Sequence, residues 1–476
     1  MLVELHVFWQ LKFLFNNNLY PKFKIMTRFM LKNFLLIFFL SAAGMVNAQD
    51  ERISIEEFTM DNGLHVIMHK DNSSPVVAIN VMYHVGSKNE DPERTGFAHF
   101  FEHLMFEGSE NIPRGEYFKF VQNAGGQNNA FTTFDKTSYY EVLPSNQLEL
   151  GLWLESERML HLKIDSIGVE TQRKVIKEER KQSYENRPYG SFIARMFENA
   201  FVEHPYRWVP IGEVQYIDQA TLDEFIKFHE HFYVPNNATL AIAGDIDYAE
   251  TKKLVKAYFG SIEKGEHEIY RPDVEEPTQT EERRQIVYDN IQLPAVFLGY
   301  KTTAEGTADY YALSMLQKLL SDGQSSRLYK SLVDEQQLAL QVAAFPYNLE
   351  DHGIFITLGL VNMGIDVADL EKALLEEIEK VKTDGLTDFE FEKIQNQAES
   401  DFINQNSTME GIALSLANYY TFFGDANLIN TELEKYQKVT REDIVRVANK
   451  YLTEDNRVVL HYLPKSEENT DDTAAN

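Results

Sequence analysis

Residues 85–109 read VGSKNEDPERTGFAHFFEHLMFEGS, and within them His99, Glu102 and His103 form the pattern H-x-x-E-H. The apolar residues around the pattern predict a helix that ends at Gly108. Two histidines four residues apart share one helix face, so both imidazoles can reach one cation. Glu102 lies at the edge of that face, where it can accept a proton from water whose pKa zinc lowers toward about 7. The stretch predicts a zinc centre with a general base; the alternative is a helix that buries one histidine and exposes the other.

A third ligand is expected on the helix predicted over residues 169–184. A catalytic zinc usually has three protein ligands, and because the chain has no cysteine the third must be a histidine or a carboxylate. Val175 and Ile176 are predicted to face the core. Glu179 follows them by four and three residues, which points its carboxylate inward, whereas Glu178 satisfies only one of these spacings. We therefore expect Glu179 to bind the metal, with a buried ion pair to an arginine as the alternative.

The remaining pattern predicts an α+β fold in two similar halves. In the first half, alternating β-branched stretches and turn residues predict strands within 53–85 and at 137–144 and 238–246, with helices at 147–161, 169–184 and 222–232. The second half repeats this order, which indicates a degenerate duplication, with strands at 284–290, 295–302, 352–360 and 457–463 and helices at 309–320, 326–334, 366–383 and 388–405.

The domain limits follow from composition. Residues 263–284 are polar, charged and contain two prolines, which is typical of a linker. We therefore expect an N-terminal domain over residues 49–262, a C-terminal domain over 285–464, and a disordered acidic tail over 465–476.

The first 48 residues have the composition of a targeting segment. From Met26 onward, two basic residues precede an apolar run and then small residues, which predicts a secretory signal peptide cleaved before Gln49. The apolar run is shorter than the roughly 20 residues that a membrane span needs. We interpret residues 1–48 as a signal peptide whose natural start is Met26. The mature chain is then exported, periplasmic or secreted, without a stable membrane anchor.

Composition excludes several other classes. Of 476 residues, 45 are Lys or Arg and 74 are Asp or Glu, a net charge of −29, and the basic residues form no stripe that would bind nucleic acid. With 43% hydrophobic and 12% aromatic residues the chain can bury a large core. The absence of cysteine excludes disulfides, thiolate nucleophiles and Cys-ligated metals. No G-x-S-x-G elbow or glycine-rich phosphate loop supports serine hydrolase or nucleotide chemistry.

The stretch at 85–109 resembles the active-site region of the inverzincin peptidases of family M16, which includes pitrilysin, insulin-degrading enzyme and the mitochondrial processing peptidase. Similar stretches follow in the expected order over most of residues 53–260: GGQNNAFTTFDKTSYY from Gly125, RKVIKEER around Glu179, HPYRWVPIG from His204 and FYVPNNATLAIAGDID from Phe232. The second half is similar more weakly, through GQSSRLYKSLVDEQQLAL at 323–340.

The resemblance implies a two-domain half-clam with a LuxS/MPP-like metallohydrolase fold, in which each half consists of paired α/β subdomains. It implies one Zn²⁺ per chain, held by His99, His103 and Glu179 with Glu102 as base, in agreement with the residues chosen from spacing.

The resemblance also implies how substrate binds. The strand near Asn129 and Ala130 would be a sheet edge to which an extended peptide adds as a further strand. The alternative for Asn129 is a turn residue.

Two positions depart from the family pattern. Where the family often has a Glu that supports the metal site, this chain has Gln172, whose amide can still hydrogen-bond to a ligand. Where active members place an Arg and a Tyr that stabilise the oxyanion, alignment on the serines at 325 and 326 gives Val333 and Leu340. Loss of such donors can cost roughly 3 to 4 kcal/mol each. The alternative is a slip of alignment, because Arg327 and Tyr329 lie close by.

These residues lead to a functional hypothesis. We expect a zinc endopeptidase that cleaves extended or unfolded peptides and is the metal-bearing subunit of a heterodimer, in which a second M16-like chain supplies the Arg and Tyr; a homodimer is the other assembly considered. The alternative is a non-catalytic scaffold or binding subunit, which the intact H-x-x-E-H pattern disfavours. A hydrolase of a non-peptide substrate is disfavoured by the expected peptide-binding edge strand.

Overall fold

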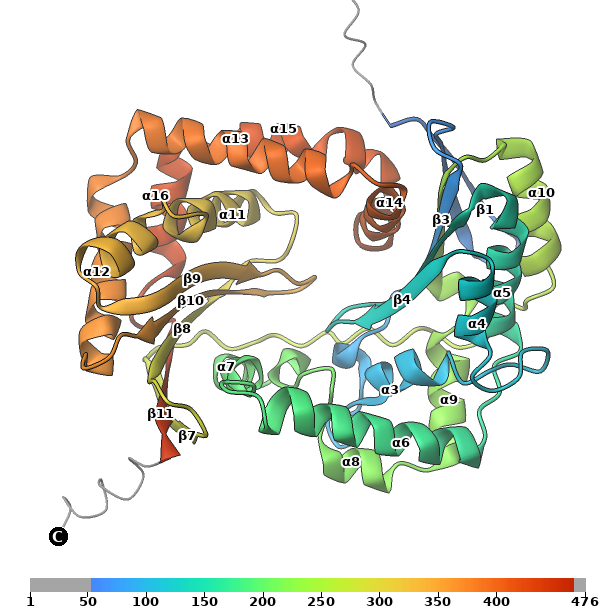
Figure 1. The fold of residues 1–476 in the computed structure, drawn as a ribbon, viewed down its shortest axis with the longest axis horizontal. Helices are drawn as coiled ribbons and strands as arrows, with labels where there is room; N and C mark the ends of the chain where they lie inside the picture. The colour runs from blue at the N-terminus through green and yellow to red at the C-terminus, as the bar shows by residue number, and fades with distance from the viewer. Residues whose placement is uncertain (1–52, 466–476) are drawn as a thin grey trace, which may run out of the picture. The chain divides into compact units, whose positions relative to one another are not determined.

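The computed structural model describes residues 53–465, so that the predicted signal peptide at 1–48 and the acidic tail from residue 466 onward lie outside the described residues. Two β-sheets, each accompanied by helices, make up this part of the chain (Figure 1). No helix within residues 53–465 combines the length and the apolar character that a membrane span requires.

The first sheet has the strand order β1-β2-β6-β3-β5-β4. Its strands are β1 (Ile55–Thr59), β2 (His65–Lys70), β3 (Val76–Tyr83), β4 (Gln127–Thr132), β5 (Thr137–Pro144) and β6 (Ala238–Gly244). β2 and β6 run parallel, and all other neighbours are antiparallel. The central strands β3 and β6 are almost entirely buried, since both of their faces are covered.

The second sheet has the order β7-β11-β8-β10-β9. Its strands are β7 (Arg283–Asp289), β8 (Ala295–Thr302), β9 (Ala339–Tyr347), β10 (Gly353–Val361) and β11 (Arg457–Pro464). Here β7 and β11 run parallel and the other neighbours are antiparallel. These five strands therefore correspond in order and direction to β2, β6, β3, β5 and β4, as the predicted duplication requires.

The helices follow the same repeated order. In the first half they are α3 (Phe97–Leu104), α4 (Tyr117–Asn123), α5 (Leu148–Leu160), α6 (Ser166–Arg180), α7 (Phe192–Ala200), α8 (Val214–Gln219), α9 (Leu222–Phe232) and α10 (Tyr248–Phe259). In the second half they are α11 (Ala308–Ser321), α12 (Val367–Asp384), α13 (Asp388–Gln405), α14 (Met409–Phe423), α15 (Glu432–Gln437) and α16 (Arg441–Tyr451). A π-helical segment at Tyr329–Glu335 lies where a helix over 326–334 was predicted, and another, Lys181–Glu185, continues α6.

One helix of each half packs against the sheet of the other half. α7 packs on β8 and β11, and its counterpart α14 packs on β3 and β6 (Figure 1). A shared core results, in which Phe134 and Phe197 of the first half are buried with Phe297, Ile354 and Leu460 of the second. Residues 54–465 therefore form one compact unit.

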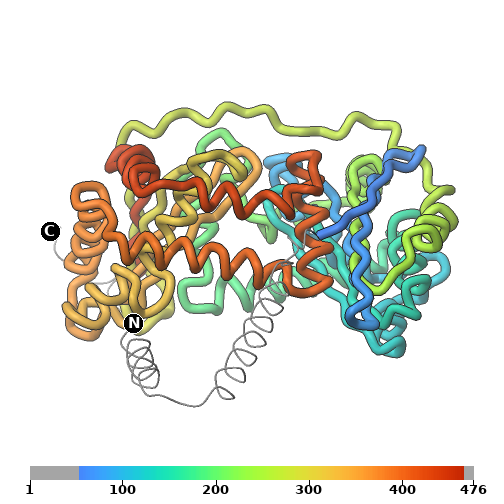
Figure 2. The backbone as a smooth tube through the Cα atoms, turned by 90° about the horizontal axis from the view of Figure 1, so that it is seen from above, coloured from blue at the N-terminus to red at the C-terminus, as the bar shows by residue number. Residues whose placement is uncertain are grey.

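The segment that joins the halves is extended but bonded to the first half. Residues 263–282 contain no helix or strand, and Figure 2 shows them as one long yellow-green stretch. The Tyr270 carbonyl accepts from Asn89 Nδ2 at 3.0 Å, and Arg271 donates to Asn237 Oδ1 at 2.6 Å. β7 begins at Arg283, so the strand includes the last two residues of the predicted linker. The domain limits themselves remain our proposal.

Candidate metal centre

The helix that carries H-x-x-E-H is capped by a carboxylate rather than by a residue of its own first turn. Gly96, at φ 101°, precedes α3 and has no side chain to offer. Glu90 accepts instead from the backbone N–H groups of Gly96 at 2.9 Å and Ala98 at 2.8 Å. Burial raises the pKa of Glu90 to about 8. α3 ends at Leu104, one turn earlier than the predicted end at Gly108.

Aromatic packing fixes the orientation of α3. The rings of Phe97 and Phe100 lie 4.7 and 4.4 Å from the ring of Phe225 on α9, and Phe101 stacks on Phe228 at 5.5 Å. Large buried rings of this kind contribute much of the packing energy of a core. α3 also packs against α6 and the edge strand β4, which border the H-x-x-E-H residues.

The structure brings together the three side chains predicted as ligands. The Nε2 atom of His103 lies 3.2 Å from Glu179 Oε2, and that of His99 lies 3.6 Å from Glu179 Oε1. One ligand atom from each side chain falls within 4.8 Å of the other two, and no other group of three such residues does so among residues 53–465. Two imidazole nitrogens and a carboxylate oxygen are donors that zinc prefers, and three protein ligands leave one position open. The residues present therefore fit zinc.

The charges of the three groups are linked. Burial, with the nearby charge of His103, lowers the pKa of His99 to about 4, so this imidazole keeps its lone pair at neutral pH. Burial lowers the pKa of His103, but hydrogen bonding to Glu179 and nearby carboxylate charge outweigh it and raise the value. The hydrogen bond from His103 lowers the pKa of Glu179. His103 Nε2 and Glu179 Oε2 thus share a proton, and a divalent cation bound between them would displace that proton.

Glu102 is held from the neighbouring edge strand. Its Oε2 accepts a hydrogen bond from the Thr132 hydroxyl at 2.7 Å. Burial raises the pKa of Glu102, and the bond from Thr132 lowers it in part. Thr132 was not predicted from the sequence, although it lies within the stretch GGQNNAFTTFDKTSYY.

Comparison with known proteins identifies the family. Two family models match, Insulinase (Peptidase family M16) over residues 65–206 and Peptidase M16 inactive domain over residues 219–398. The zinc protease PqqE of Helicobacter pylori is 32% identical over 431 residues, which cover 90% of this chain and 97% of that protein. The chain belongs to peptidase family M16.

Other relatives agree with this assignment. The uncharacterized zinc protease YmxG of Bacillus subtilis is 25% identical, over 85% of this chain and 98% of that protein. The crystal structure of a protease from Helicobacter pylori matches with a TM-score of 0.83 at 33% identity. The match covers 86% of this chain and 100% of the chain in that crystal structure. A putative M16-like peptidase from Alicyclobacillus acidocaldarius has a TM-score of 0.76 at 20% identity, over 86% and 98% of the two chains. The predicted family and the mixed α/β fold in two homologous halves are confirmed.

The other M16-derived expectations concern β4 and Gln172. Asn129 and Ala130 lie in β4, which is paired with β5 on one side and has no strand on its other side in the described sheet. The Asn129 side chain accepts from the Ala130 backbone N–H at 2.9 Å. Gln172 lies beside the centre, with its Oε1 3.2 Å from Nδ1 of His103.

One argument for Glu179 was half wrong. Ile176 is fully buried, but Val175 is 44% exposed and does not face the core. Glu178 is exposed and bonds to Gln182, so it does not approach the histidines. The direction of Glu179 is set by the packing of α6 on α3 through Ile176.

The second-half positions expected to hold oxyanion donors are apolar. Val333 packs against the second core, and Leu340 on β9 is 49% exposed. Arg327, the nearby alternative, donates to Glu390 at 2.8 Å and to the Gly385 carbonyl at 2.6 Å. Its guanidinium is therefore already engaged within the second half.

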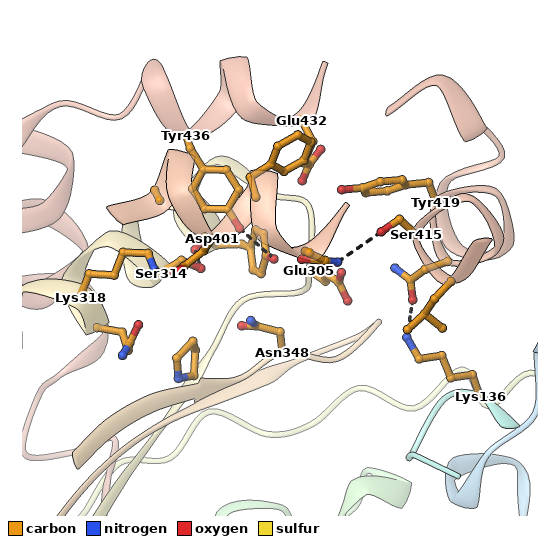
Figure 3. A pocket seen from close by; sticks show the side chains of 18 residues that line it. Lys136, Glu305, Ser314, Lys318, Asn348, Asp401, Ser415, Tyr419, Glu432 and Tyr436 are labelled. Atoms are coloured by element: carbon orange, nitrogen blue, oxygen red, sulfur yellow. Dashed lines mark hydrogen bonds and ion pairs between the residues drawn. The ribbon is translucent and has the colours of Figure 1, made fainter. Parts of the chain in front are cut away.

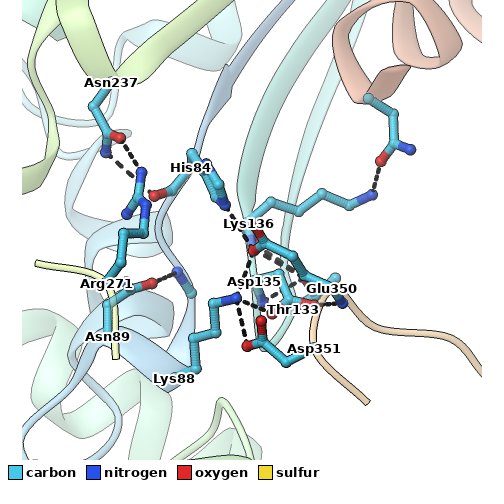
Figure 4. A network of polar contacts seen from close by, with 12 residues as sticks. His84, Lys88, Asn89, Thr133, Asp135, Lys136, Asn237, Arg271, Glu350 and Asp351 are labelled. Atoms are coloured by element: carbon cyan, nitrogen blue, oxygen red, sulfur yellow. Dashed lines mark hydrogen bonds and ion pairs between the residues drawn. The ribbon is translucent and has the colours of Figure 1, made fainter. Parts of the chain in front are cut away.

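A buried ion network joins the two edge hairpins of this M16 chain (Figure 4). Lys88 is 2% exposed, and its Nζ lies 3.0 Å from Asp135, 2.5 Å from Glu350 and 2.9 Å from Asp351, while His84 contacts Glu350 at 2.8 Å. Burial lowers the pKa of Lys88, but the three carboxylates outweigh it and raise the value. The turn between β4 and β5 is thus tied to the turn between β9 and β10. No local pattern in the sequence indicated this network.

The second half has a polar cavity at the counterpart of the metal centre (Figure 3). Ser314, Gln317 and Lys318 on α11 repeat the spacing of H-x-x-E-H, and Asp401 on α13 pairs with Lys318. Asp401 follows the helix cap Thr387 by fourteen residues (401 − 387), as Glu179 follows the cap Asp165 of α6 (179 − 165). The cavity measures about 370 Å³, and its lining includes Lys136, Glu305, Ser314, Lys318, Asp401 and Tyr419.

Proposed function

We propose that this chain is a zinc-dependent endopeptidase that cleaves extended or unfolded peptides. Zinc is held by His99, His103 and Glu179, and Glu102 is the general base. The observation that carries this proposal is the convergence of two imidazole nitrogens and one carboxylate oxygen within 4.8 Å of one another. The names of its relatives, which are zinc proteases, support the choice of metal and reaction.

Zinc, when bound, supplies Lewis-acid chemistry that polarises a carbonyl oxygen and lowers the pKa of water. The residues of the chain do the rest. Burial raises the pKa of Glu102, which brings the carboxylate closer to the range in which a general base works at neutral pH. The bond from Thr132 fixes its orientation, so that it takes the proton from the attacking water and passes it to the leaving amine.

Substrate binding follows from the position of β4. An edge strand offers unpaired backbone groups, to which an extended peptide adds by main-chain hydrogen bonds. Thr132 ends β4 and contacts Glu102, so a peptide laid along Asn129 and Ala130 would reach the base. Selection by backbone rather than by side chains suits unfolded substrates.

The chain is proposed to act as the metal-bearing subunit of a heterodimer. Val333 and Leu340 cannot donate to an oxyanion, and Arg327 is already bonded to Glu390. A second M16-like chain would supply the missing Arg and Tyr. We also propose that the mature chain begins at Gln49 and is exported, on the strength of the signal-peptide pattern in residues 26–48.

The test uses the chain with the partners it has in its own cells. A tagged wild-type chain and a tagged Glu102→Gln chain are purified under mild conditions and given a mixed library of extended peptides with zinc. We expect cleavage by the wild-type preparation only. Equal cleavage by both, or none from a zinc-bearing wild-type preparation, would contradict the peptidase proposal and favour a scaffold. Full turnover by a pure homodimer would contradict the heterodimer.

A further inference from the structure

The metal centre has Gln172 in place of the supporting carboxylate that the resemblance implies. Another carboxylate, that of Glu107, lies on the side of Gln172 that faces away from His103. Gln172 Nε2 donates to Glu107 Oε1 at 2.6 Å, while Gln172 Oε1 faces His103 Nδ1 at 3.2 Å. Glu107 follows α3 in the chain and is only 8% exposed. The amide of Gln172 therefore bridges a ligand histidine and a buried carboxylate.

The chemistry of these groups fixes the direction of every hydrogen bond. The two carboxyl oxygens of Glu107 accept from Gln172 Nε2 and Arg114 Nη1, so the Gln172 NH₂ faces Glu107. The Gln172 oxygen must then face His103, and Nδ1 of His103 must carry a proton. Its Nε2, which points to Glu179, is left to bind a metal with its lone pair.

Glu107 is itself held in place. Arg114 donates through Nη1 to Glu107 Oε2 and through Nη2 to Asp165 Oδ1, the latter at 2.8 Å. Asp165 caps α6 by accepting from the Gly168 backbone N–H at 2.8 Å. A Cβ at Gly168 would lie 2.8 Å from Arg114 Nη1, so a side chain there would push the end of this arginine from its present position. The start of α6 and the turn after α3 are thus fixed relative to each other.

We propose that Glu107 and Gln172 together replace a single supporting carboxylate and act as positioning residues for His103. Glu107 fixes the Gln172 amide, and Gln172 fixes both the rotation and the tautomer of the imidazole. Outer hydrogen bonds of this kind raise metal affinity by orienting the ligand and increasing its basicity. The inference rests on the zinc centre of the proposed function, and not on peptidase activity.

The experiment measures the zinc dissociation constant of the full mature chain by competition with a chromophoric chelator. Glu107→Gln removes the outer charge, and Gln172→Met removes the bridge while leaving the Glu107–Arg114 pair intact, so at least one variant tests the idea if the other fails to fold. Each is expected to weaken zinc binding by roughly 10- to 100-fold. Glu110→Gln is the matched control, because Glu110 lies in the same turn and pairs with His161 instead.

Rescue separates positioning from a merely structural role. In the double variant Glu107→Gln/Gln172→Glu a carboxylate contacts His103 directly, so zinc affinity should return to within about threefold of the wild type. Zinc affinities of the single variants equal to that of Glu110→Gln, or a double variant no better than Glu107→Gln, would overturn the inference alone. A folded wild-type chain that binds no zinc would overturn the proposed function as well.

Discussion

The two halves of the chain place equivalent helices beside equivalent edge strands, but they fill the space between them differently. On α3 the first half has His99 and His103 four residues apart, and on α11 the second half has Ser314 and Lys318 at the same spacing. The packing is similar, since α3 contacts α6 and β4 as α11 contacts α13 and β9. The backbone therefore does not decide which half can bind a metal.

The facing carboxylates show what does decide it. Glu179 faces two imidazoles, whereas Asp401 pairs with the ammonium group of Lys318. An aspartate with its own lysine is neutralised without a cation. Glu179 has no such lysine, only the hydrogen bond to His103 and the uncharged imidazole of His99, and a divalent cation would satisfy all three groups at once. The two halves therefore differ in the group that neutralises the facing carboxylate: the Lys318 side chain in the second half, and a metal cation, when bound, in the first.

The largest expected effect is on zinc affinity. Glu179→Gln should weaken zinc binding by about two to three orders of magnitude. The free energy of binding zinc at a structural site with four protein ligands is roughly 10–16 kcal/mol, and each ligand contributes a part of it. Asp401→Asn, the matched change in the second half, should leave the affinity unchanged. Chelator competition measures both. Weaker zinc binding by Asp401→Asn would contradict this difference between the two halves.

Asp401→Asn, which should leave zinc affinity unchanged, should instead lower the free energy of unfolding. Asp401→Asn leaves the largely buried Lys318 with Asp322 alone, at 3.7 Å, and should cost about 1–2 kcal/mol of unfolding free energy with or without zinc. Zinc at 100 times its dissociation constant should add about 2.7 kcal/mol to the wild type and to Asp401→Asn. Under the same conditions Glu179→Gln should gain little. Urea unfolding with and without zinc measures these terms, and an equal gain in Glu179→Gln would place the metal elsewhere.

A smaller effect concerns the network between the halves. Burial raises the pKa of Asp351, but bonds from His204 and Lys88 outweigh it and lower the value below its usual range. A carboxyl whose folded pKa is lowered stabilises the fold above its unfolded value of about 3.9 and loses that contribution as pH falls toward the folded value. Asp351→Asn should therefore cost about 1 kcal/mol at neutral pH and progressively less as pH falls below about 3.9, with allowance for partial solvent screening. Urea unfolding from pH 7 to pH 2.5 gives the curve; parallel curves for the two chains would contradict the assignment.

The smallest effect compares the residues that lead into the two edge strands. Gly125 at φ 82° lies two residues before β4, and Gln337 at φ 56° lies two residues before β9. A left-handed conformation costs a side chain roughly 1–2 kcal/mol, and glycine loses roughly 0.5–1 kcal/mol in chain entropy. Gln337→Gly should thus stabilise the fold by about 0.5 kcal/mol, and Gly125→Ala should destabilise it by about 1 kcal/mol. Thermal unfolding of both variants measures this; a destabilised Gln337→Gly would show that the glutamine side chain is needed there.

Local patterns in the sequence predicted the parts of the centre that one helix determines. His99 and His103 meet because residues four apart always share a helix face. Thr132, Glu107 and Arg114 were not found, since their roles depend on β4 and α6 approaching α3 from distant parts of the chain. Glu107 stands four residues after His103, but that spacing carries no meaning once α3 has ended at Leu104.

The fold was predictable where elements are amphipathic or strongly β-branched, as in β3 or α13. β9 was missed because its sequence ALQVAAFPY combines alanines with a proline, which is tolerated at a sheet edge but is untypical of strands. α14 was missed although its sequence MEGIALSLANYYTFF is largely apolar. It packs against the sheet of the first half and against the segment Ala426–Asn430 that follows it, so it shows no clear polar face.

The central claim is that the first half alone binds the metal, at His99, His103 and Glu179. The most direct measurement is anomalous X-ray diffraction at the zinc edge from crystals of the mature chain grown with zinc. We expect one strong peak among those three side chains and none in the cavity that contains Lys318 and Asp401. A peak in that cavity, or no peak between the two histidines in a well-ordered crystal, would contradict it.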